Sequence, residues 1–378
     1  MKLFVPKEPA SEPRVAVSPD VVKRLAGLGV EAVVESGAGT AAGLPDSVLS
    51  EAGASIAADP AAAMAEADII SVVRPPAPEA LANAKRGAVL IGLLSPYADH
   101  ARLKAYAEAG VTAFALEFVP RISRAQTMDA LSSQANLGGY SAVIQAASCF
   151  GRGFPMMVTA AGTIAPARVL VLGAGVAGLQ AIATARRLGA IVSGMDVRPA
   201  AKEQVESLGA TYLDVESVEA RQAETSGGYA REMSSDYRVR QAEKLLEVLP
   251  RIDIVITTAL IPGRPAPLLL TTEMVEAMRP GSVIVDMAVE QGGNVHPSVP
   301  GENVVHKDVT IIGDTNLPGR VATDASALYA RNIFNFLTPL IDKEAGDWKI
   351  DWEDEIVSSS LVCRDGAITN PVLLEKGE

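Results

Sequence analysis

The sequence predicts an α/β protein of two parallel-sheet domains, with the second domain inserted into the first. At 378 residues the chain is longer than one ordinary domain. Hydrophobic residues make up 48% of it and aromatic residues only 4%, a composition typical of buried parallel strands covered by alanine-rich helices. Apolar segments and helical patterns also alternate strictly along the chain, and this order favours parallel sheets with right-handed crossovers.

The first domain is expected to start with a strand at residues 3–6 and a helix over 20–28, which Ser18 caps and Gly29 ends. Small residues dominate 130–153, and we expect a long helix there that connects the two domains. Further strands of the first domain are predicted by apolar segments at 30–35, 68–73, 88–92 and 111–116.

A second alternating unit follows, and after it the chain is expected to return to the first domain. A helix over 323–340 and a strand-like segment at 356–368 have no place in the second sheet. We therefore assign residues 1–131 and 310–378 to the first domain and 132–309 to the second. The elements expected in the second domain are strands at Arg168–Leu172, Ile191–Met195, 252–257 and 282–286 and helices over 176–188 and 199–208.

Charge and hydropathy argue against several classes of protein. A net charge of −12 disfavours nucleic-acid binding, because phosphates require clustered Lys and Arg. No apolar run approaches the roughly 20 residues that span a bilayer, and Pro6 and Lys7 interrupt the opening MKLFVPKEPA too early for a signal peptide. Cys149 and Cys363 follow no metal or redox spacing. We expect two small buried hydrophobic side chains, a reducing compartment and no metal site.

The segment ARVLVLGAGVAGLQAIATARRLGAIVSGMDVR carries the main functional signal. Its buried strand leads into a G-x-G-x-x-G pattern that opens a helix. The first glycine permits a tight turn, the second lets the backbone approach a pyrophosphate, and the third lets helix and strand pack closely. The helix N-terminus then offers unpaired N–H groups to the phosphates. We expect a Rossmann domain whose cofactor contacts include Gly173, Ala174, Gly175, Val176, Ala177 and Gly178.

An acidic residue, Asp196, ends the second strand about 20 residues after the glycines, where Rossmann domains bind the adenosine ribose. A carboxylate at this place repels a 2′-phosphate, so NAD(H) is favoured over NADP(H), with Val197 and Arg198 as neighbouring contacts. Arg198 is a counter-signal, because an arginine can accept that phosphate. The alternative is that Arg198 is solvated or paired with an acid.

The chain offers few groups for acid–base chemistry. A dehydrogenase of hydroxy or amino acids moves a proton as well as a hydride, and it needs a positioned acid–base group, usually His or Lys. His100, His296 and His306 have no neighbouring pattern that suggests a catalytic dyad. We expect all three to be solvated.

A second polar cluster, PRISRAQTMDALSSQ, covers residues 120–134 at the expected junction of the domains. Loops beside an open sheet are places where ligands bind. The alternative is a capped helix start and a solvated loop, and for Asp129 and Ser132 the two interpretations are equally consistent with the sequence.

With these residues the chain resembles a known family, the NAD(H)-binding components of proton-translocating nicotinamide nucleotide transhydrogenases in their separate-subunit form. The resemblance covers residues 5–294, and the chain length also fits a separate subunit without a membrane part. It rests on PKE…RVAVSP, PRISRAQTMDALSSQANLGGY, VLGAGVAGLQAIATARRLGA, AETSGGYAREM, TTALIPGRPAP and VDMAVEQGGN.

The resemblance implies hydride transfer from NADH on this chain to NADP+ on a partner subunit, coupled to proton movement through a membrane subunit. Such a step needs only two rings held with their reacting atoms roughly 3–3.5 Å apart. By match to the family's loop, Arg121, Asp129 and Ser132 orient the nicotinamide end, and Gln126 reaches toward the partner's NADP(H). The family also implies a homodimer in the cytoplasm, associated with the inner membrane through its partners.

Two further motifs carry expected contacts with the nucleotide. AETSGGYAREM matches a mobile loop of the family that closes over bound nucleotide, with contacts from Gly228, Tyr229 and Met233. The stretch TTALIPGRPAP follows a strand at the carboxyl edge of the sheet, where Thr258, Ala259 and Leu260 are placed to line the adenosine end.

Alanine dehydrogenases share the two-domain architecture, but they use a Lys and a His that this chain lacks. The corresponding stretches contain Arg74 in SVVRPPAP, and Leu93 or Leu94 in VLIGLLSPY in place of the His. Arg14 of the RVAVSP segment is retained, and we expect it and Arg74 to be relics or structural ion partners. A free-standing amino-acid dehydrogenase and an NAD-sensing regulatory protein remain the alternative functions.

Overall fold

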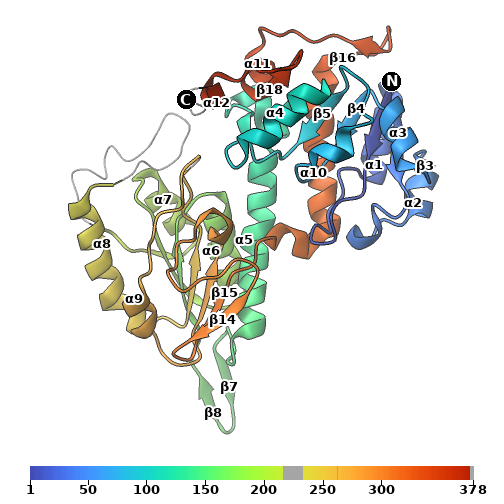
Figure 1. The fold of residues 1–378 in the computed structure, drawn as a ribbon. Helices are drawn as coiled ribbons and strands as arrows, with labels where there is room; N and C mark the ends of the chain where they lie inside the picture. The colour runs from blue at the N-terminus through green and yellow to red at the C-terminus, as the bar shows by residue number, and fades with distance from the viewer. Residues whose placement is uncertain (216–232, 262, 375–378) are drawn as a thin grey trace. The chain divides into compact units, whose positions relative to one another are not determined.

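The computed structural model describes residues 1–215, 233–261 and 263–374. The chain forms two compact units, Met1–Gln134 with Gly319–Glu378 and, between them in sequence, Ala135–Pro318. Each unit is a sheet flanked by helices (Figure 1). The predicted α/β class with two parallel-rich sheets is therefore confirmed.

The first unit is built on an eight-stranded sheet in the order β19-β18-β6-β5-β4-β1-β2-β3. Strands β1 to β6 are parallel, and β18 pairs antiparallel with β6. The order reverses between β1 and β4, which in doubly wound sheets creates a crevice at the carboxyl edge. The strands are β1 (Lys2–Val5), β2 (Glu31–Glu35), β3 (Ser55–Ala57), β4 (Ile69–Ser71), β5 (Val89–Gly92), β6 (Thr112–Ala115), β18 (Leu361–Arg364) and β19 (Ala367–Ile368).

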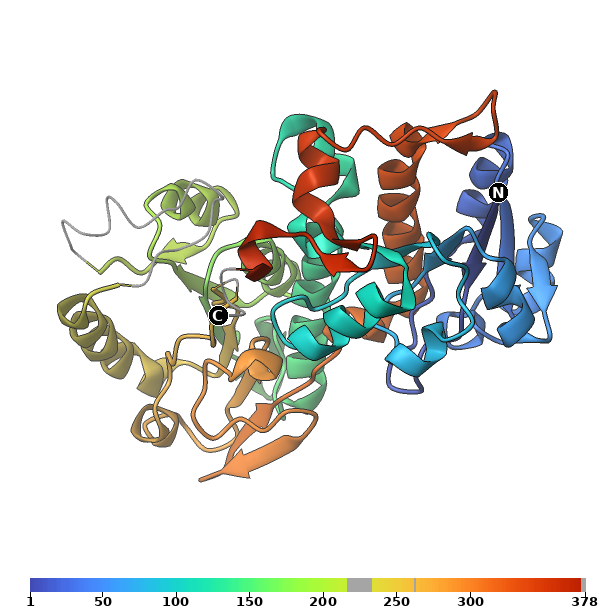
Figure 2. The same cartoon turned by 45° about the horizontal axis from the view of Figure 1, so that its top comes forward.

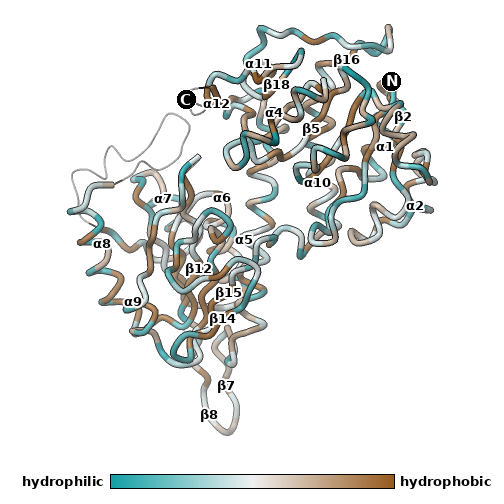
Figure 3. Tube along the Cα trace, viewed as in Figure 1, coloured by the Kyte–Doolittle hydropathy of each residue, from teal (hydrophilic) through white to brown (hydrophobic). Residues whose placement is uncertain are grey.

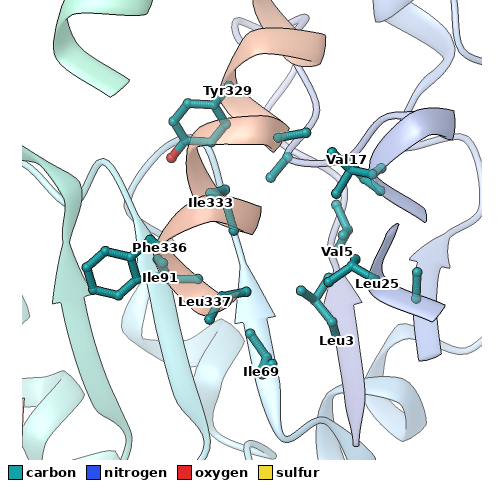
Figure 4. Packing of buried hydrophobic residues seen from close by; sticks show 14 of the residues in the cluster. Leu3, Val5, Val17, Leu25, Ile69, Ile91, Tyr329, Ile333, Phe336 and Leu337 are labelled. Carbon is teal, nitrogen blue, oxygen red and sulfur yellow. The ribbon is translucent and has the colours of Figure 1, made fainter. Parts of the chain in front are cut away.

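The two faces of this sheet pack against different helices. Tyr329 and Ile333 of α10 contact the face that carries Leu3, Ile69 and Ile91 (Figure 4), whereas α3 and α4 contribute to the cluster on the other face. Alternate residues of each buried strand thus enter opposite cores, as a period of two requires. The helices of this unit are α1 (Pro19–Gly27), α2 (Asp46–Glu51), α3 (Pro60–Glu66), α4 (His100–Ala109), α10 (Ala322–Leu337), α11 (Glu355–Ser360) and α12 (Pro371–Leu374).

The second unit has a seven-stranded sheet in the order β11-β10-β9-β12-β13-β15-β14. All pairs are parallel except β14–β15, an antiparallel pair at one edge (Figure 2). Its strands are largely hydrophobic (Figure 3). They are β9 (Arg168–Leu172), β10 (Ile191–Met195), β11 (Thr211–Tyr212), β12 (Ile254–Thr257), β13 (Val283–Asp286), β14 (Asn303–His306) and β15 (Val309–Ile312).

Helices α5, α6 and α7 cover one face of this sheet, and α8 and α9 cover the other. Small residues allow α5 and α6 to approach closely: a Cβ on Gly139 would lie 2.1 Å from the carbonyl oxygen of Ala177. A separate hairpin is formed by β7 (Met157–Thr159) and β8 (Gly162–Ile164). The helices are α5 (Ala130–Cys149), α6 (Val176–Arg187), α7 (Ala200–Ser207), α8 (Ser235–Val248) and α9 (Thr272–Glu276).

Several short elements complete the two units. The antiparallel pair β16 (Ile341–Asp342) and β17 (Asp347–Trp348) lies in the C-terminal tail. The 3₁₀ helices are η1 (Thr40–Ala42), η2 (Pro78–Leu81), η3 (Leu116–Phe118), η4 (Ser123–Met128), η6 (Leu249–Arg251), η7 (Val289–Gln291), η8 (Leu317–Val321) and η9 (Thr338–Leu340).

The tail returns to the first unit as expected, but three details differ from the sequence predictions. Residues 356–360 are helical rather than extended, because the Asp354 side chain accepts from the Ile356 N–H and caps α11. The boundary expected after residue 309 falls inside β15, which pairs with β13. Cys363 is buried as expected, whereas Cys149 is exposed at the last position of α5.

Candidate functional site

The glycine-rich turn after β9 has the geometry that its sequence predicts. Gly173 adopts φ +98°, a left-handed conformation that favours glycine. A Cβ on Gly178 would lie 1.8 Å from the Gly173 carbonyl oxygen, so only glycine lets α6 pack this close to the turn. Gly175 is the N-cap of α6 and has no side chain to accept from the first N–H groups of the helix. This helix start is therefore suited to an anion.

Asp196 lies beside this turn, directly after β10. Its Oδ2 accepts from the Ala174 N–H at 2.7 Å and from Arg198 Nη2 at 3.0 Å. Its Oδ1 accepts from the backbone N–H of Arg198 at 2.8 Å and from Nε at 3.0 Å. Arg198 is thus paired with an acid, one of the two alternatives that the sequence left open.

The loop after β12 is joined to the glycine-rich turn. The Thr258 N–H donates to the Leu172 carbonyl at 2.8 Å, and its hydroxyl donates to the Gly173 carbonyl at 3.0 Å. Thr258, Ala259 and Leu260 are all half-buried. The structure therefore brings this loop, the glycine-rich turn and Asp196 together at the carboxyl edge of one sheet.

The expected mobile loop lies mainly outside the described residues. Gly228 and Tyr229 belong to that part of the chain. Met233 is described, and its side chain is buried in a hydrophobic cluster that also contains Met195 and Tyr237.

The polar segment 120–134 belongs to the first unit. Asp129 and Ser132 contact each other: the carboxylate accepts from the Ser132 N–H at 2.8 Å and from its hydroxyl at 2.5 Å. This pair lies at the first turn of α5. Arg121 and Gln126 are exposed on the same segment, in and beside η4.

A network of buried charges lies beyond β1 and β4 in the first unit. Glu12 forms a two-pronged ion pair with Arg14, at 2.7 and 2.6 Å, and accepts from Arg74 Nε at 2.9 Å. The side chains of Glu12 and Arg14 are 1% and 3% exposed, so this carboxylate serves both guanidinium groups without water. Arg14 and Arg74 are structural ion partners, as the sequence suggested.

Two more buried carboxylates bind backbone groups at the same sheet edge. Glu8 accepts from the N–H groups of Val73 and Arg74, at 2.6 and 3.2 Å, and burial raises its pKa to about 7. Glu117 accepts from the N–H groups of Leu94 and Ser95, and burial raises its pKa to about 6. The sequence assigned no role to either acid.

The histidines form no catalytic dyad within the described residues. His100 is exposed at the first position of α4. His296 is also exposed, and its Nδ1 lies 2.7 Å from the Thr272 hydroxyl. His306 pairs with Glu276 at 2.9 Å on the surface.

Residues 1–215, 233–261 and 263–374 contain no group of three or more His, Cys, Asp or Glu side chains placed to hold a metal ion. Across these same ranges, no helix combines the length and hydropathy that crossing a membrane requires.

A parallel sheet with its order reversed beside β9, a glycine-rich turn and an acid after the second strand define a dinucleotide-binding α/β protein. Residues 4–138 match the N-terminal domain of alanine dehydrogenase/PNT, and 142–371 match its C-terminal domain. The chain belongs to this NAD-binding family.

Similar proteins narrow the comparison to one branch of the family. The first segment of the divided NAD(P) transhydrogenase subunit alpha of Rhodospirillum rubrum is 54% identical, with all of both chains covered. Its counterpart in Rickettsia prowazekii is 47% identical, over 100% of this chain and 98% of that one. The transhydrogenase structure from Sinorhizobium meliloti superposes with a TM-score of 0.88 at 47% identity, covering 97% of this chain and 100% of the other.

Alanine dehydrogenases are more distant from this chain. The enzyme of Halomonas elongata is 30% identical over 99% of this chain and 96% of its own. A solved L-alanine dehydrogenase has a TM-score of 0.82 at 25% identity and covers 99% of this chain and 98% of its own.

Proposed function

We propose that this chain is the NAD(H)-binding subunit of a proton-translocating transhydrogenase. The observation that carries the proposal is the carboxyl edge of the second sheet. There, Gly175 opens α6 without a side-chain cap, Gly178 tolerates no Cβ, and Asp196 lies beside the turn. The nicotinamide, when bound, supplies or accepts the hydride.

The residues of the second unit hold the nucleotide in this proposal. The α6 N-terminus binds the pyrophosphate through N–H groups from Gly175 to Gly178, and Asp196 accepts from the adenosine ribose, with Val197 and Arg198 beside it. Thr258, Ala259 and Leu260 line the adenosine side. Gly228, Tyr229 and Met233 are the proposed contacts of a closing loop.

Residues of the first unit take part at the nicotinamide end. Arg121, Asp129 and Ser132 orient the carboxamide and ribose, and Gln126 reaches toward NADP(H) on the partner. The bond from Asp129 to Ser132 supports a fixed orientation for this pair.

Direct hydride transfer needs no general acid or base on this chain, and the first unit is consistent with that. Leu94 is 0% exposed at the place where the dehydrogenases use a His. Glu12 already neutralises Arg14 and Arg74. These features disfavour the alternative function of an alanine-type dehydrogenase.

The proposed partners are an NADP(H)-binding subunit and a membrane subunit that couples the hydride step to proton movement. The names of the Rhodospirillum and Rickettsia relatives support such an assembly, because each denotes one piece of a larger enzyme. We place the chain in the cytoplasm, held at the inner membrane through these partners.

We further propose a homodimer that forms through the β7–β8 hairpin. The hairpin projects from the second unit in Figure 1, and all six of its strand residues are exposed. Val158 is 74% and Met156 63% exposed. Two-stranded hairpins are marginally stable in isolation, so an apolar cover from a second copy would stabilise this one.

Reconstitution tests the proposed function. The purified chain is mixed with an NADP(H)-binding transhydrogenase subunit, and hydride transfer from NADPH to an NAD analogue is followed. Transfer that requires both proteins supports the proposal. NADH formation from alanine by this chain alone would replace it with the dehydrogenase function, and NADH binding without any transfer would favour an NAD sensor.

Arg121→Ala tests the proposed nicotinamide end in the same assay. Because Arg121 is assigned to orientation rather than affinity, transfer should slow by at least about tenfold while the dissociation constant for NADH changes little. The exposed Arg124, which pairs with Asp354 at 2.5 Å, provides a matched control as Arg124→Ala. Wild-type transfer rates in Arg121→Ala would remove Arg121 from the site.

A further inference from the structure

Asn294 is a completely buried polar residue in the VDMAVEQGGN motif, which has no role in the function proposed above. Its Oδ1 accepts from the Ala259 N–H at 3.0 Å, and its Nδ2 donates to the Ala259 carbonyl at 2.9 Å. Nδ2 also donates to the Pro267 carbonyl at 2.8 Å. The side chain thus pairs with both backbone groups of Ala259, as a neighbouring strand would.

Asp286 fixes Asn294 in this position. It ends β13, is 0% exposed, and accepts from the Asn294 N–H at 3.2 and 3.0 Å and from the Val295 N–H at 3.2 Å. The turn between them requires glycine: Gly293 has φ +77°, and a Cβ there would lie 2.7 Å from Asp286 Oδ2. The backbone of Asn294 is therefore anchored to the sheet before its side chain reaches the next loop.

Asn294 holds the loop that contacts the glycine-rich turn. Ala259 directly follows Thr258, whose N–H and hydroxyl bind the carbonyls of Leu172 and Gly173. A continuous path of hydrogen bonds and backbone therefore joins Asp286 through Asn294 to the turn. Every polar group of the Asn294 amide serves this path or Pro267, as a buried amide requires.

We infer that Asn294 is a positioning residue for the nucleotide site: it sets the backbone of Ala259, and thereby the loop 258–260, against the glycine-rich turn. It acts without touching the nucleotide. The inference rests on the proposed binding of NAD(H) at this edge of the second sheet.

The first experiment compares Asn294→Ala with Asn303→Ala, a matched substitution at an exposed position of the edge strand β14. NADH is titrated by fluorescence, and hydrogen exchange of the Ala259 amide is measured on the full chain without nucleotide. Losing the bonds to Ala259 should weaken NADH binding about tenfold and deprotect that amide, with protection in β9 and β12 retained. Asn303→Ala should match the wild type in both.

Asn294→Asp separates positioning from general destabilisation. As a carboxylate the new side chain keeps an acceptor for the Ala259 N–H but loses both donor bonds, whereas the protonated acid regains one donor. NADH affinity of this variant should therefore rise toward the wild-type value as pH is lowered, and the ratio to wild type at each pH measures the rescue. A structural role alone predicts fewer binding sites with unchanged affinity and no such rescue.

Three results would overturn the inference: wild-type affinity in Asn294→Ala, retained protection of the Ala259 amide, or fewer sites of unaltered affinity. Failure of the proposed function is recognised separately, because then the wild type and Asn303→Ala would not bind NADH either.

Discussion

Asp196 shows at the scale of one residue how the cofactor site is tuned. Both carboxylate oxygens accept from Arg198, and one also accepts from the Ala174 N–H. The side chain is only 6% exposed, so these bonds are poorly accessible to water. A ribose that donates to Asp196 has to compete with a guanidinium, and the choice between NAD(H) and NADP(H) therefore depends on this pair of residues.

Asp196→Ala should lower NADH affinity by about 10- to 100-fold, because hydrogen bonds to a charged group contribute about 1.5–3 kcal/mol. NADPH affinity should fall less or rise, since the substitution releases the Arg198 guanidinium from its carboxylate and removes the charge that repels a 2′-phosphate. Paired titrations with both nucleotides measure the difference. Arg198→Ala is the control and should retain the preference for NADH. Equal losses for the two nucleotides in Asp196→Ala would contradict this account.

The next scale is that of strand, turn and helix, where β9 and α6 depend on a glycine. Gly178→Ala places a methyl group 1.8 Å from the Gly173 carbonyl oxygen and 2.8 Å from its carbon. The backbone of the turn has to move, so we expect a loss of about 1–3 kcal/mol in the free energy of unfolding and a clear loss of NADH affinity. Denaturant unfolding and titration measure both quantities.

Gly151→Ala is the matched control for this prediction, because a Cβ at Gly151 meets nothing within 4 Å. The exposed position should tolerate alanine with no loss of NADH affinity. If both variants bound NADH as the wild type does, the close packing of β9 and α6 would have no bearing on the site.

The end of β1 is tied to the end of β4 by a carboxylate that titrates near neutrality. Glu8 accepts from two N–H groups after β4, and burial raises its pKa from 4.5 to about 7. An acid whose folded pKa is raised contributes stability that is fully present below its unfolded pKa of 4.5 and is lost as pH rises through about 7. Glu117, with its pKa raised to about 6, acts in the same direction.

Glu8→Gln should therefore flatten the pH dependence of stability. Between pH 5 and pH 7 the wild type should lose up to about 1.4 kcal/mol of unfolding free energy per pH unit through Glu8, and the variant should lack this contribution. Urea unfolding at several pH values measures both slopes, and the remaining acids, including Glu117, cancel in the comparison. Identical slopes would mean that Glu8 titrates alike in the folded and unfolded chains.

At the scale of the whole molecule, the local signals of the sequence were sufficient for both sheets and for the nucleotide edge. Strand periodicity and the spacing of Gly173 to Gly178 depend on neighbouring residues, so one sequence reveals them. The Glu12 network does not have this property: its partners Arg74 and Gln134-bound Arg14 join segments 62 and 120 positions apart. Asn294 was missed for a related reason, because only the fold shows that its amide faces Ala259.

The β7–β8 hairpin carries the last prediction, which concerns assembly. Val158→Asp places a charge at the most exposed apolar position of the hairpin. In a dimer formed through this ribbon the charge loses its water, so self-association should weaken by at least about tenfold. Sedimentation equilibrium measures the dissociation constant. Val239→Asp is the control, because Val239 is also apolar and 58% exposed but lies on α8. Since the hairpin is distinct from the glycine-rich turn, Val158→Asp should still bind NADH. An unchanged dimer constant would move the dimer surface elsewhere, whereas a monomeric wild type would remove the homodimer from the proposed assembly and leave the nucleotide site intact.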